Sequence, residues 1–173
     1  KSQQHEDDVR AEVKADPASY HGSIAAKELH WFDPYRNIWV TQSDDGDWQG
    51  WHSKDGTTAQ VDRDEHWIPW ANAFDGDNAP FYRWFSGGHT NACFNQVDRH
   101  VLAGRGGQVA LVFEGDRWDP SKNGGSGGPV YEQRITYNEL LIEVSLRARV
   151  LRNVGLGRGD RIALNLPNIL EQI

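Results

Sequence analysis

Residues 131–155 set the fold class, and they read YEQRITYNELLIEVSLRARVLRNVG. Thr136 followed by Glu139 is a capping box, in which the hydroxyl and the carboxylate each satisfy a free amide at a helix start. Gly155 suits the left-handed residue that ends a helix, and arginines near that end favour the negative pole of the helix dipole. Apolar residues recur between these signals at helical spacing: Leu140, Leu141, Val144, Ala148 and Leu151. The stretch therefore predicts an amphipathic helix that starts at residue 137.

Strand patterns lie on both sides of this helix. Val109–Glu114 is a continuous apolar run of strand length, Tyr131–Ile135 is a second strand, and the Gly-rich segment 122–129 joins them as a hairpin loop. Beyond the helix, Arg161–Leu166 reads as a third strand, followed by the opening of a new helix. Strand, hairpin, helix and strand in this order predict an α/β fold. We expect the chain to be a fragment of a larger protein, because the last pattern looks cut and residue 1 is not Met.

The N-terminal half begins with two predicted helices. Residues 1–15 are polar with little apolar stripe, so we expect a frayed helix. Asp16 before Pro17 starts a second helix, because the carboxylate caps free amides and proline fits the first helical position. This helix is expected to end near Trp31. A further helix is predicted over residues 90–102.

A Trp-rich β-meander is predicted next. Six of the eight tryptophans lie between positions 31 and 70. Breaks at Asp-Gly pairs are typical of hairpin turns, because glycine tolerates a positive φ. The breaks leave three short strands: Asn37–Thr41, Asp47–Trp51 and Thr57–Val61. We predict two parts, an N-terminal helical segment with this meander over residues 1–79 and an incomplete α/β domain over residues 80–173.

Composition excludes several classes of function. The chain has 18 Lys and Arg against 25 Asp and Glu, a net charge of −7, which argues against binding to duplex nucleic acid or to anionic membrane surfaces. A single cysteine, Cys93, excludes an internal disulfide and a multi-cysteine zinc cage. No apolar run reaches the length of a membrane span, and the charged start is no signal peptide. We predict a cytoplasmic protein.

Four motifs suggest chemistry but have plainer interpretations. Gly124–Gly128 lacks the Lys-Ser/Thr pair and the following helix of a phosphate loop. Arg158-Gly159-Asp160 is interpreted as a turn, and the seven histidines show no metal-ligand spacing, so no metal site is predicted. Cys93 and His100 lie too far apart on a helix for a thiolate and its base, so we expect a small buried thiol.

A longer signature follows the meander. It comprises an aromatic pair, a glycine turn, two asparagines and a charged triplet, and its positions are Trp84, Phe85, Gly87, Gly88, Asn91, Asn95, Asp98, Arg99 and His100. In this order it resembles the N-terminal signature of AMP-forming acyl-CoA synthetases of the acetyl-CoA synthetase type. Ile135-Thr136-Tyr137, Gly159–Ala163 and Pro167-Asn168 continue the resemblance.

Three further segments resemble the ligase module of propionyl-CoA synthases, which are fusion enzymes. They are His30–Pro34, which opens a Trp-rich insert, Ala79–Phe85 and Phe113–Asp119. Acetyl-CoA synthetases of the ordinary kind lack so long an aromatic insert as Asp44–Asp75. The resemblance therefore covers all but the first fifteen residues.

This resemblance implies the adenylate-forming fold and a ligase that activates 3-hydroxypropionate with ATP, Mg²⁺ and CoA. In the fusion enzyme, further modules would form propionyl-CoA with NADPH. The family's phosphate loop, acidic motifs and catalytic lysine have no counterpart in residues 1–173, so no catalytic residue is assigned and the signature positions are expected to be structural. The expected partners are the remaining domains of the same polypeptide and a small acid, and a homo-oligomer is allowed.

The tryptophans support an alternative function. Aromatic faces among acids and amides also stack on sugar rings, so a stand-alone carbohydrate- or protein-binding module is the competing hypothesis. The plainer interpretation is that the indoles pack an accessory layer.

Overall fold

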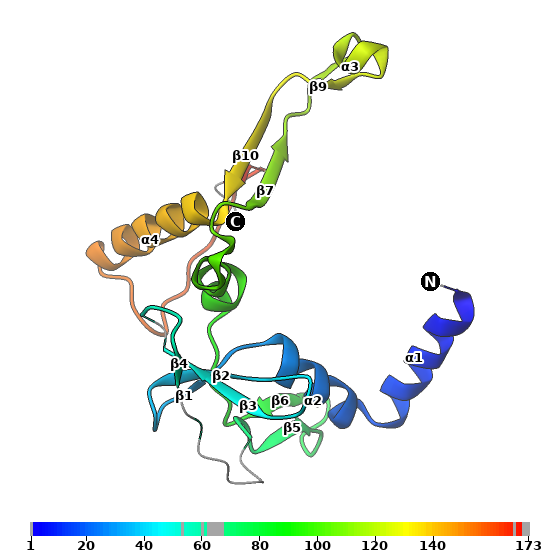
Figure 1. Cartoon of the computed structure of the whole chain (residues 1–173), viewed down its shortest axis with the longest axis vertical. Coiled ribbons are helices and arrows are strands. Elements are labelled where there is room, and N and C mark those ends of the chain that lie inside the picture. The colour runs from blue at the N-terminus through cyan, green and yellow to red at the C-terminus, as the bar shows by residue number, and fades with distance from the viewer. Residues whose placement is uncertain (1, 53, 60, 62–67, 168, 171–173) are drawn as a thin grey trace. The chain divides into compact units, whose positions relative to one another are not determined.

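The computed structural model describes residues 2–52, 54–59, 61, 68–167 and 169–170. The chain divides into two compact units, residues 1–96 and residues 97–173, and each is described by itself (Figure 1). The predicted boundary after residue 79 falls between two paired strands of the first unit.

The first unit starts with two capped helices. In α1 (Gln3–Ala15) the Ser2 hydroxyl accepts from the backbone N–H of His5, and α2 (Pro17–Glu28) is capped by Asp16 with proline at its start, as predicted. The predicted end near Trp31 is wrong. Leu29 has extended backbone angles (φ −113°, ψ 148°), so the helix stops at Glu28 and Trp31 begins a strand instead.

Two small antiparallel sheets follow in the same unit. The first has the order β1-β2-β3-β4, from β1 (Trp31–Asp33), β2 (Ile38–Gln42), β3 (Trp48–Trp51) and β4 (Thr58–Ala59). The strands predicted for this region lie within one residue of the starts of β2, β3 and β4, and the last of them includes position 60, which lies outside the described residues. A second sheet pairs β5 (Asn72–Asp75) with β6 (Arg83–Ser86).

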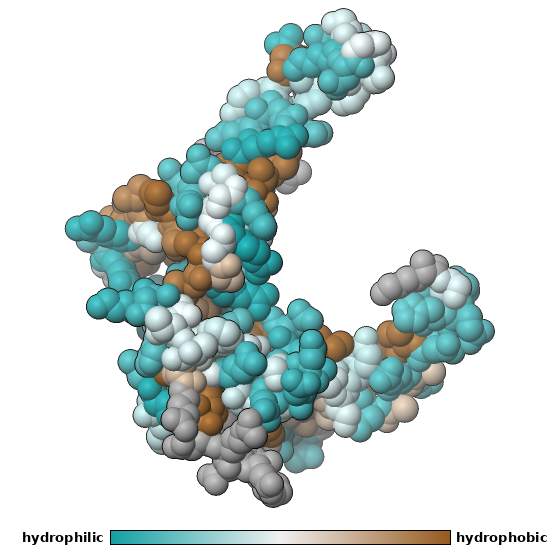
Figure 2. Space-filling model, viewed as in Figure 1, coloured by the Kyte–Doolittle hydropathy of each residue, from teal (hydrophilic) through white to brown (hydrophobic). Residues whose placement is uncertain are grey.

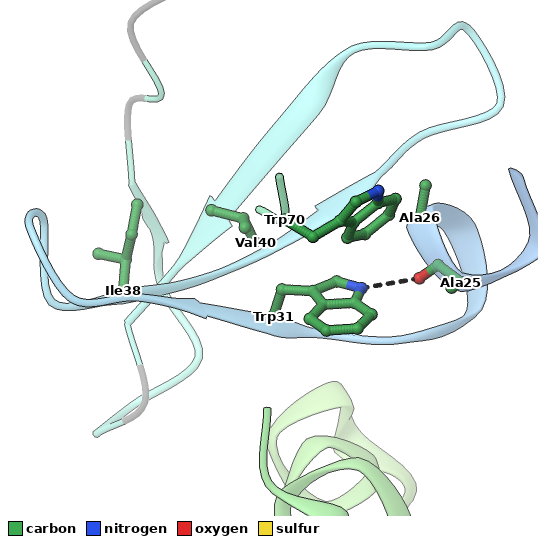
Figure 3. Close-up of a cluster of buried hydrophobic side chains, with 6 residues drawn as sticks. All are labelled: Ala25, Ala26, Trp31, Ile38, Val40 and Trp70. Carbon is green, nitrogen blue, oxygen red and sulfur yellow. Dashed lines mark hydrogen bonds between the residues drawn. The ribbon is translucent and has the colours of Figure 1, made fainter. Parts of the chain in front are cut away.

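The core of the first unit lies between α2 and the β1–β4 sheet (Figure 3). The Trp31 indole is 2% exposed, and its N–H donates to the carbonyl oxygen of Ala25 in α2 at 2.9 Å. Its ring lies 4.9 Å from that of Trp70. The cluster comprises Ala25, Ala26, Trp31, Ile38, Val40 and Trp70. A buried indole with its N–H bonded combines a large apolar area with a satisfied polar group.

Wide helical turns follow, with the boundary between the two units inside the first of them, and then a hairpin. The predicted helix near residues 90–102 is present, but with two π-helical stretches, η1 (Phe94–Asp98) and η2 (Val101–Arg105). β7 (Val109–Glu114) has the predicted bounds and pairs antiparallel with β10 (Glu132–Thr136). Between them lie β8 (Trp118–Asp119), the short turn α3 (Lys122–Gly125) and β9 (Gly128–Pro129).

α4 (Tyr137–Asn153) confirms the strongest local prediction. The Glu139 N–H donates to the Thr136 hydroxyl at 3.3 Å, and the Thr136 N–H donates to the Glu139 carboxylate at 2.8 Å. Gly155 has φ +92°, the left-handed value expected after a helix end.

The predicted strand over residues 161–166 is wrong. These residues form no strand, and Ile162, Leu164 and Leu166 are exposed. A strand needs a neighbour to satisfy its backbone groups, and none of the described residues pairs with this segment. The helix expected after Pro167 falls mainly on positions outside the described residues, Asn168 included.

The fold class is mixed α/β with small sheets. Within the described part of the chain, no helix has the length and apolar character needed to cross a membrane.

Candidate functional site

The signature begins within β6, and its two glycines form a tight turn after that strand. Gly87 has φ +82°, and the N–H of Gly88 donates to the carbonyl of Phe85 at 2.9 Å. A Cβ atom on Gly88 would lie 2.8 Å from the Trp31 ring, which is closer than side-chain carbons pack. Gly88 is therefore the residue type that lets the turn lie against the core indole. Phe85 is itself left-handed (φ +51°) and packs on Trp31, with ring centroids 5.2 Å apart.

Asn95 joins the signature to the start of β1. Its Oδ1 accepts from the backbone N–H of His30 at 2.7 Å, and its Nδ2 donates to the His30 carbonyl at 3.0 Å. Asn95 is 7% exposed. A buried amide that pairs with both backbone groups of one residue acts as a substitute strand neighbour.

Thr90 and the signature residue Asn91 complete this network. The Thr90 hydroxyl donates to the His30 carbonyl at 2.9 Å, and the Asn91 side chain accepts from the N–H of Phe94 at 3.0 Å, at the start of the wide-turn helix. The N–H of Phe32 donates to the carbonyl of His89 at 2.7 Å. The polar groups of this part of the signature are thus directed at backbone, and they hold the glycine turn against β1.

The charged triplet lies at the next helical turn, in the second unit. Asp98 ends η1, and Arg99 and His100 follow. Nδ1 of His100 contacts the guanidinium of Arg105, and its ring lies 4.6 Å from that of Tyr137 at the start of α4. Burial, together with the charges of Arg105 and Arg99, lowers the pKa of His100 below its usual 6.5. A neutral imidazole accepting from Arg105 fits this setting.

The described tryptophans of the meander region are buried or partly buried. Trp31, Trp39 and Trp70 are buried, Trp48 and Trp51 are partly buried, and Trp67 lies outside the described residues. Trp39 stacks on Phe94 with centroids 3.9 Å apart and planes at 6°. Indoles used in this way cannot stack on a sugar, so these three side chains do not support the carbohydrate-binding alternative. Among the described tryptophans, Trp84 and Trp118 are exposed.

Two pockets lined by described residues lie in the first unit. One of 320 Å³ lies beside the turn and is lined by Asp33, Trp70, Gly87 and His89 among others. Asp33 is buried, with its carboxylate accepting from the N–H groups of Tyr35 and Arg36 and paired with the Arg36 guanidinium at 3.2 Å, so its oxygens are used within the fold. The other, of 310 Å³, is apolar and lies between α2 and β6.

Sequence reasoning did not find the partner of Asn95. The bond to His30 spans 65 residues, and no local spacing signals it. The pairing of β5 with β6 was missed as well, because aromatic residues in a row without clean alternation resemble a loop.

The comparisons with known proteins agree with the signature. Residues 59–96 match the family described as acetyl-coenzyme A synthetase N-terminus. The chain is 43% identical over 105 residues to the acetyl-coenzyme A synthetase of Burkholderia thailandensis, a match that covers 61% of this chain and 14% of the relative. It is 42% identical over 105 residues to the same enzyme of Burkholderia lata, with the same coverage.

The chain is therefore similar to the N-terminal region of acetyl-coenzyme A synthetases, and the resemblance predicted from the signature is confirmed. The chain spans 14% of the length of these curated relatives.

The described residues do not fit ATP or Mg²⁺. The Gly-rich segment 122–129 contains α3 and β9 at the hairpin tip, and a helix N-terminus directed at phosphate does not follow it. The described part of the chain also holds no group of three His, Cys, Asp or Glu that could bind a metal ion. No catalytic step is therefore assigned to a residue of this chain.

Proposed function

We propose that the chain is the N-terminal portion of an ATP-dependent, AMP-forming acid–CoA ligase, and that its own residues are structural rather than catalytic. The observation that carries this is the 43% identity over 105 residues to acetyl-coenzyme A synthetases. The hydrogen bonds around the signature support the structural role of these residues. The polar groups of Asn95 and Thr90 are hydrogen-bonded to the backbone of His30. They therefore stabilise the fold and are not directed at a substrate.

We further propose that the ligase is the 3-hydroxypropionate–CoA ligase module of a propionyl-CoA synthase in the cytoplasm. The support is the sequence resemblance at His30–Pro34, Ala79–Phe85 and Phe113–Asp119. The β1–β4 sheet is then the accessory insert of that enzyme. Such a fusion enzyme would use NADPH in a reductase module in addition to ATP, Mg²⁺ and CoA.

The chemistry of the ligase explains its cofactors. A carboxylate is a poor electrophile, so its oxygen attacks the α-phosphorus of ATP, pyrophosphate leaves, and an acyl-adenylate forms. The thiol of CoA then displaces AMP and gives the thioester. Mg²⁺ and cationic groups stabilise the charge on the phosphates in such reactions. We assign these groups to parts of the polypeptide other than residues 1–173.

The test is acid-dependent ATP–pyrophosphate exchange by the intact gene product. Exchange that requires 3-hydroxypropionate, with NADPH oxidation when CoA is added, supports both proposals. Exchange that requires acetate and proceeds without NADPH oxidation would support the ligase proposal and contradict the proposal of a fusion enzyme. Absence of exchange with 3-hydroxypropionate, acetate and propionate overturns the ligase. A reaction without acid is the control.

A further inference from the structure

We propose that Asn123 is a modification site, at which the chain converts its own side-chain amide into aspartate and isoaspartate through a cyclic imide. The residue lies in α3 at the tip of the β7–β10 hairpin (Figure 1). The reaction needs water and no other partner, so it does not depend on the proposed ligase activity.

Glycine follows Asn123, and this order favours the reaction. Asn123-Gly124 is the one Asn-Gly pair in the sequence. A side chain on the second residue would shield its backbone nitrogen and restrict rotation of the peptide unit between the two residues. Glycine has no Cβ and does neither. The backbone nitrogen of Gly124 is therefore open to attack the Asn123 amide.

The backbone of the pair is close to the reactive geometry. Asn123 has φ 51° and ψ 42°, and Gly124 has φ 67° and ψ 26°, which are the angles of a type I′ turn. A type II′ turn keeps the positive φ of the first residue but has a ψ of about −120° there. This rotation turns the Gly124 nitrogen toward the Cβ side of Asn123, within reach of Cγ. Only the φ of Gly124 must change sign, which glycine does without a steric penalty.

The hairpin tip is open to solvent. Residues 122–126 are exposed, and Figure 2 shows mostly hydrophilic and neutral residues at this tip. Hydroxide can therefore remove the proton of the Gly124 N–H, and water can reach the imide that forms.

The atoms of the reaction balance without an oxidant or a reductant. The Gly124 nitrogen gives its proton to hydroxide and bonds to Cγ of Asn123. The bond between Cγ and Nδ2 breaks, and Nδ2 leaves as ammonia after taking a proton from water. One water molecule then opens the five-membered imide. Opening at Cγ gives aspartate, and opening at the main-chain carbonyl gives isoaspartate.

The conversion removes a hydrogen bond that closes the tip. Nδ2 of Asn123 donates to the carbonyl oxygen of Gly127 at 2.9 Å, and Gly127 is buried. A carboxylate has no hydrogen to donate, so the carbonyl loses its partner and faces a negative charge instead. We therefore expect the pairing of β8 with β9 to open more often after the reaction.

The test follows three asparagines in the intact gene product during incubation at mildly alkaline pH. Asn37 is exposed and has the same left-handed backbone (φ 55°), but Ile38 after it is 2% exposed and lies in β2. Asn78 is exposed in a turn, is not left-handed, and precedes Ala79. Peptide mass spectrometry measures conversion, and an isoaspartate methyltransferase labels the product. We expect Asn123 to convert at least about tenfold faster than either control, because only Asn123 combines the left-handed φ with a following glycine.

Equal rates at Asn123 and Asn37 would overturn the proposal. Conversion of Asn123 in urea but not in the folded protein would also overturn it, because the fold would then protect the residue. Asn123→Gln should give no isoaspartate at this position over the same time, since the ring would need a sixth atom. The three asparagines of the unsubstituted protein still decide the outcome if this variant does not fold.

Hydrogen exchange of fresh and converted protein measures the effect on the tip. Faster exchange of the amides of residues 118–129 after conversion is expected, with no change in α4. Unchanged exchange at the tip would show that the bond from Asn123 to Gly127 does not hold it closed.

Discussion

The two units differ in where their apolar side chains lie. In residues 1–96 the indoles of Trp31 and Trp70 are buried with aliphatic residues between a helix and a sheet. Among the described residues of the second unit, Val97 is the buried hydrophobic side chain, whereas Ile142, Leu146 and Val150 are exposed.

Sequence composition does not explain this difference. α4 carries as regular an apolar pattern as any segment of the first unit, and its cap is complete. The first unit has two layers that face each other, α2 and the β1–β4 sheet, while α4 has a two-stranded hairpin on one side. An apolar stripe becomes a core only when a second layer covers it. The predictions below test this contrast.

The largest effect is expected for Trp31→Ala. The indole is 2% exposed and bonded to Ala25, so its removal should lower the free energy of unfolding by about 3–5 kcal/mol. Urea unfolding followed by far-UV circular dichroism measures this. Trp118→Ala in the second unit is the control, and because that indole is 61% exposed we expect a loss of about 0.5 kcal/mol. Losses of the same size at both positions would contradict the contrast.

Asn95→Ala should have the next largest effect and lower the free energy of unfolding by about 2 kcal/mol, because the N–H and the carbonyl of His30 both lose a buried partner. The same unfolding experiment reports it. Asn153→Ala, an exposed position at the end of α4, should be nearly neutral. If Asn95→Ala is equally neutral, the amide is not the link between the signature and β1.

Gly88→Ala tests the close approach of the turn to Trp31. The added methyl would lie 2.8 Å from the ring and 3.0 Å from the Phe85 carbonyl oxygen. We therefore expect the free energy of unfolding to fall by about 1–3 kcal/mol. Gly107→Ala is the matched control in the second unit. A Cβ there meets nothing within 4 Å, and the substitution should be neutral or slightly stabilising. Thermal unfolding measures both variants, and equal shifts of their melting temperatures would contradict the close approach of Gly88 to Trp31.

Thr136→Ala removes the helix cap of α4 and should lower the free energy of unfolding by about 1 kcal/mol, whereas Thr136→Ser should retain most of that stability. Thermal unfolding at 222 nm compares the two. Hydrogen bonds from the Thr136 N–H and hydroxyl lower the pKa of Glu139 below its usual 4.5, so the folded state holds its proton less tightly. The contribution of the cap should therefore be complete above that value and fall at lower pH. A cap effect that does not change with pH would show that the Glu139 carboxylate does not contribute to the cap.

The smallest effect concerns His100. Its pKa is lowered in the folded state by burial and by Arg105 and Arg99, so the unfolded chain binds the proton more readily. The stability conferred by the neutral ring is therefore present above pH 6.5 and declines as the pH falls below it. Unfolding measured from about pH 7 to about pH 5 should be less pH-dependent in His100→Gln. Identical profiles for the two proteins would show that the ring does not contribute.

Local chemistry made much of the fold predictable. The cap of α4, the Asp16-Pro17 start of α2, β7 and the starts of β2–β4 were all read from nearby residues. These signals succeed because a cap, a proline or a hairpin turn acts over three or four residues. The end of α2 was misjudged because Trp31 is apolar at helical spacing but belongs to the core as a strand residue.

The signature residues show the opposite case. Their order was sufficient to find the resemblance to acetyl-CoA synthetases, yet their contacts could not be derived from spacing. Asn95 reaches His30 across 65 residues, and Gly88 is shaped by an indole far away in the chain. The wide π-helical geometry of η1 likewise has no simple local signal.

The sequence by itself determined the helix starts, the turns, the hairpin and the relationship to acetyl-CoA synthetases, because each depends on neighbouring residues or on their order. The tertiary structure alone decided which apolar stripes become a core. Trp31 is buried because α2 and a sheet meet around it, whereas the equally apolar stripe of Ile142, Leu146 and Val150 faces outward. Burial depends on a second surface being present, and the pattern of one segment does not contain that information.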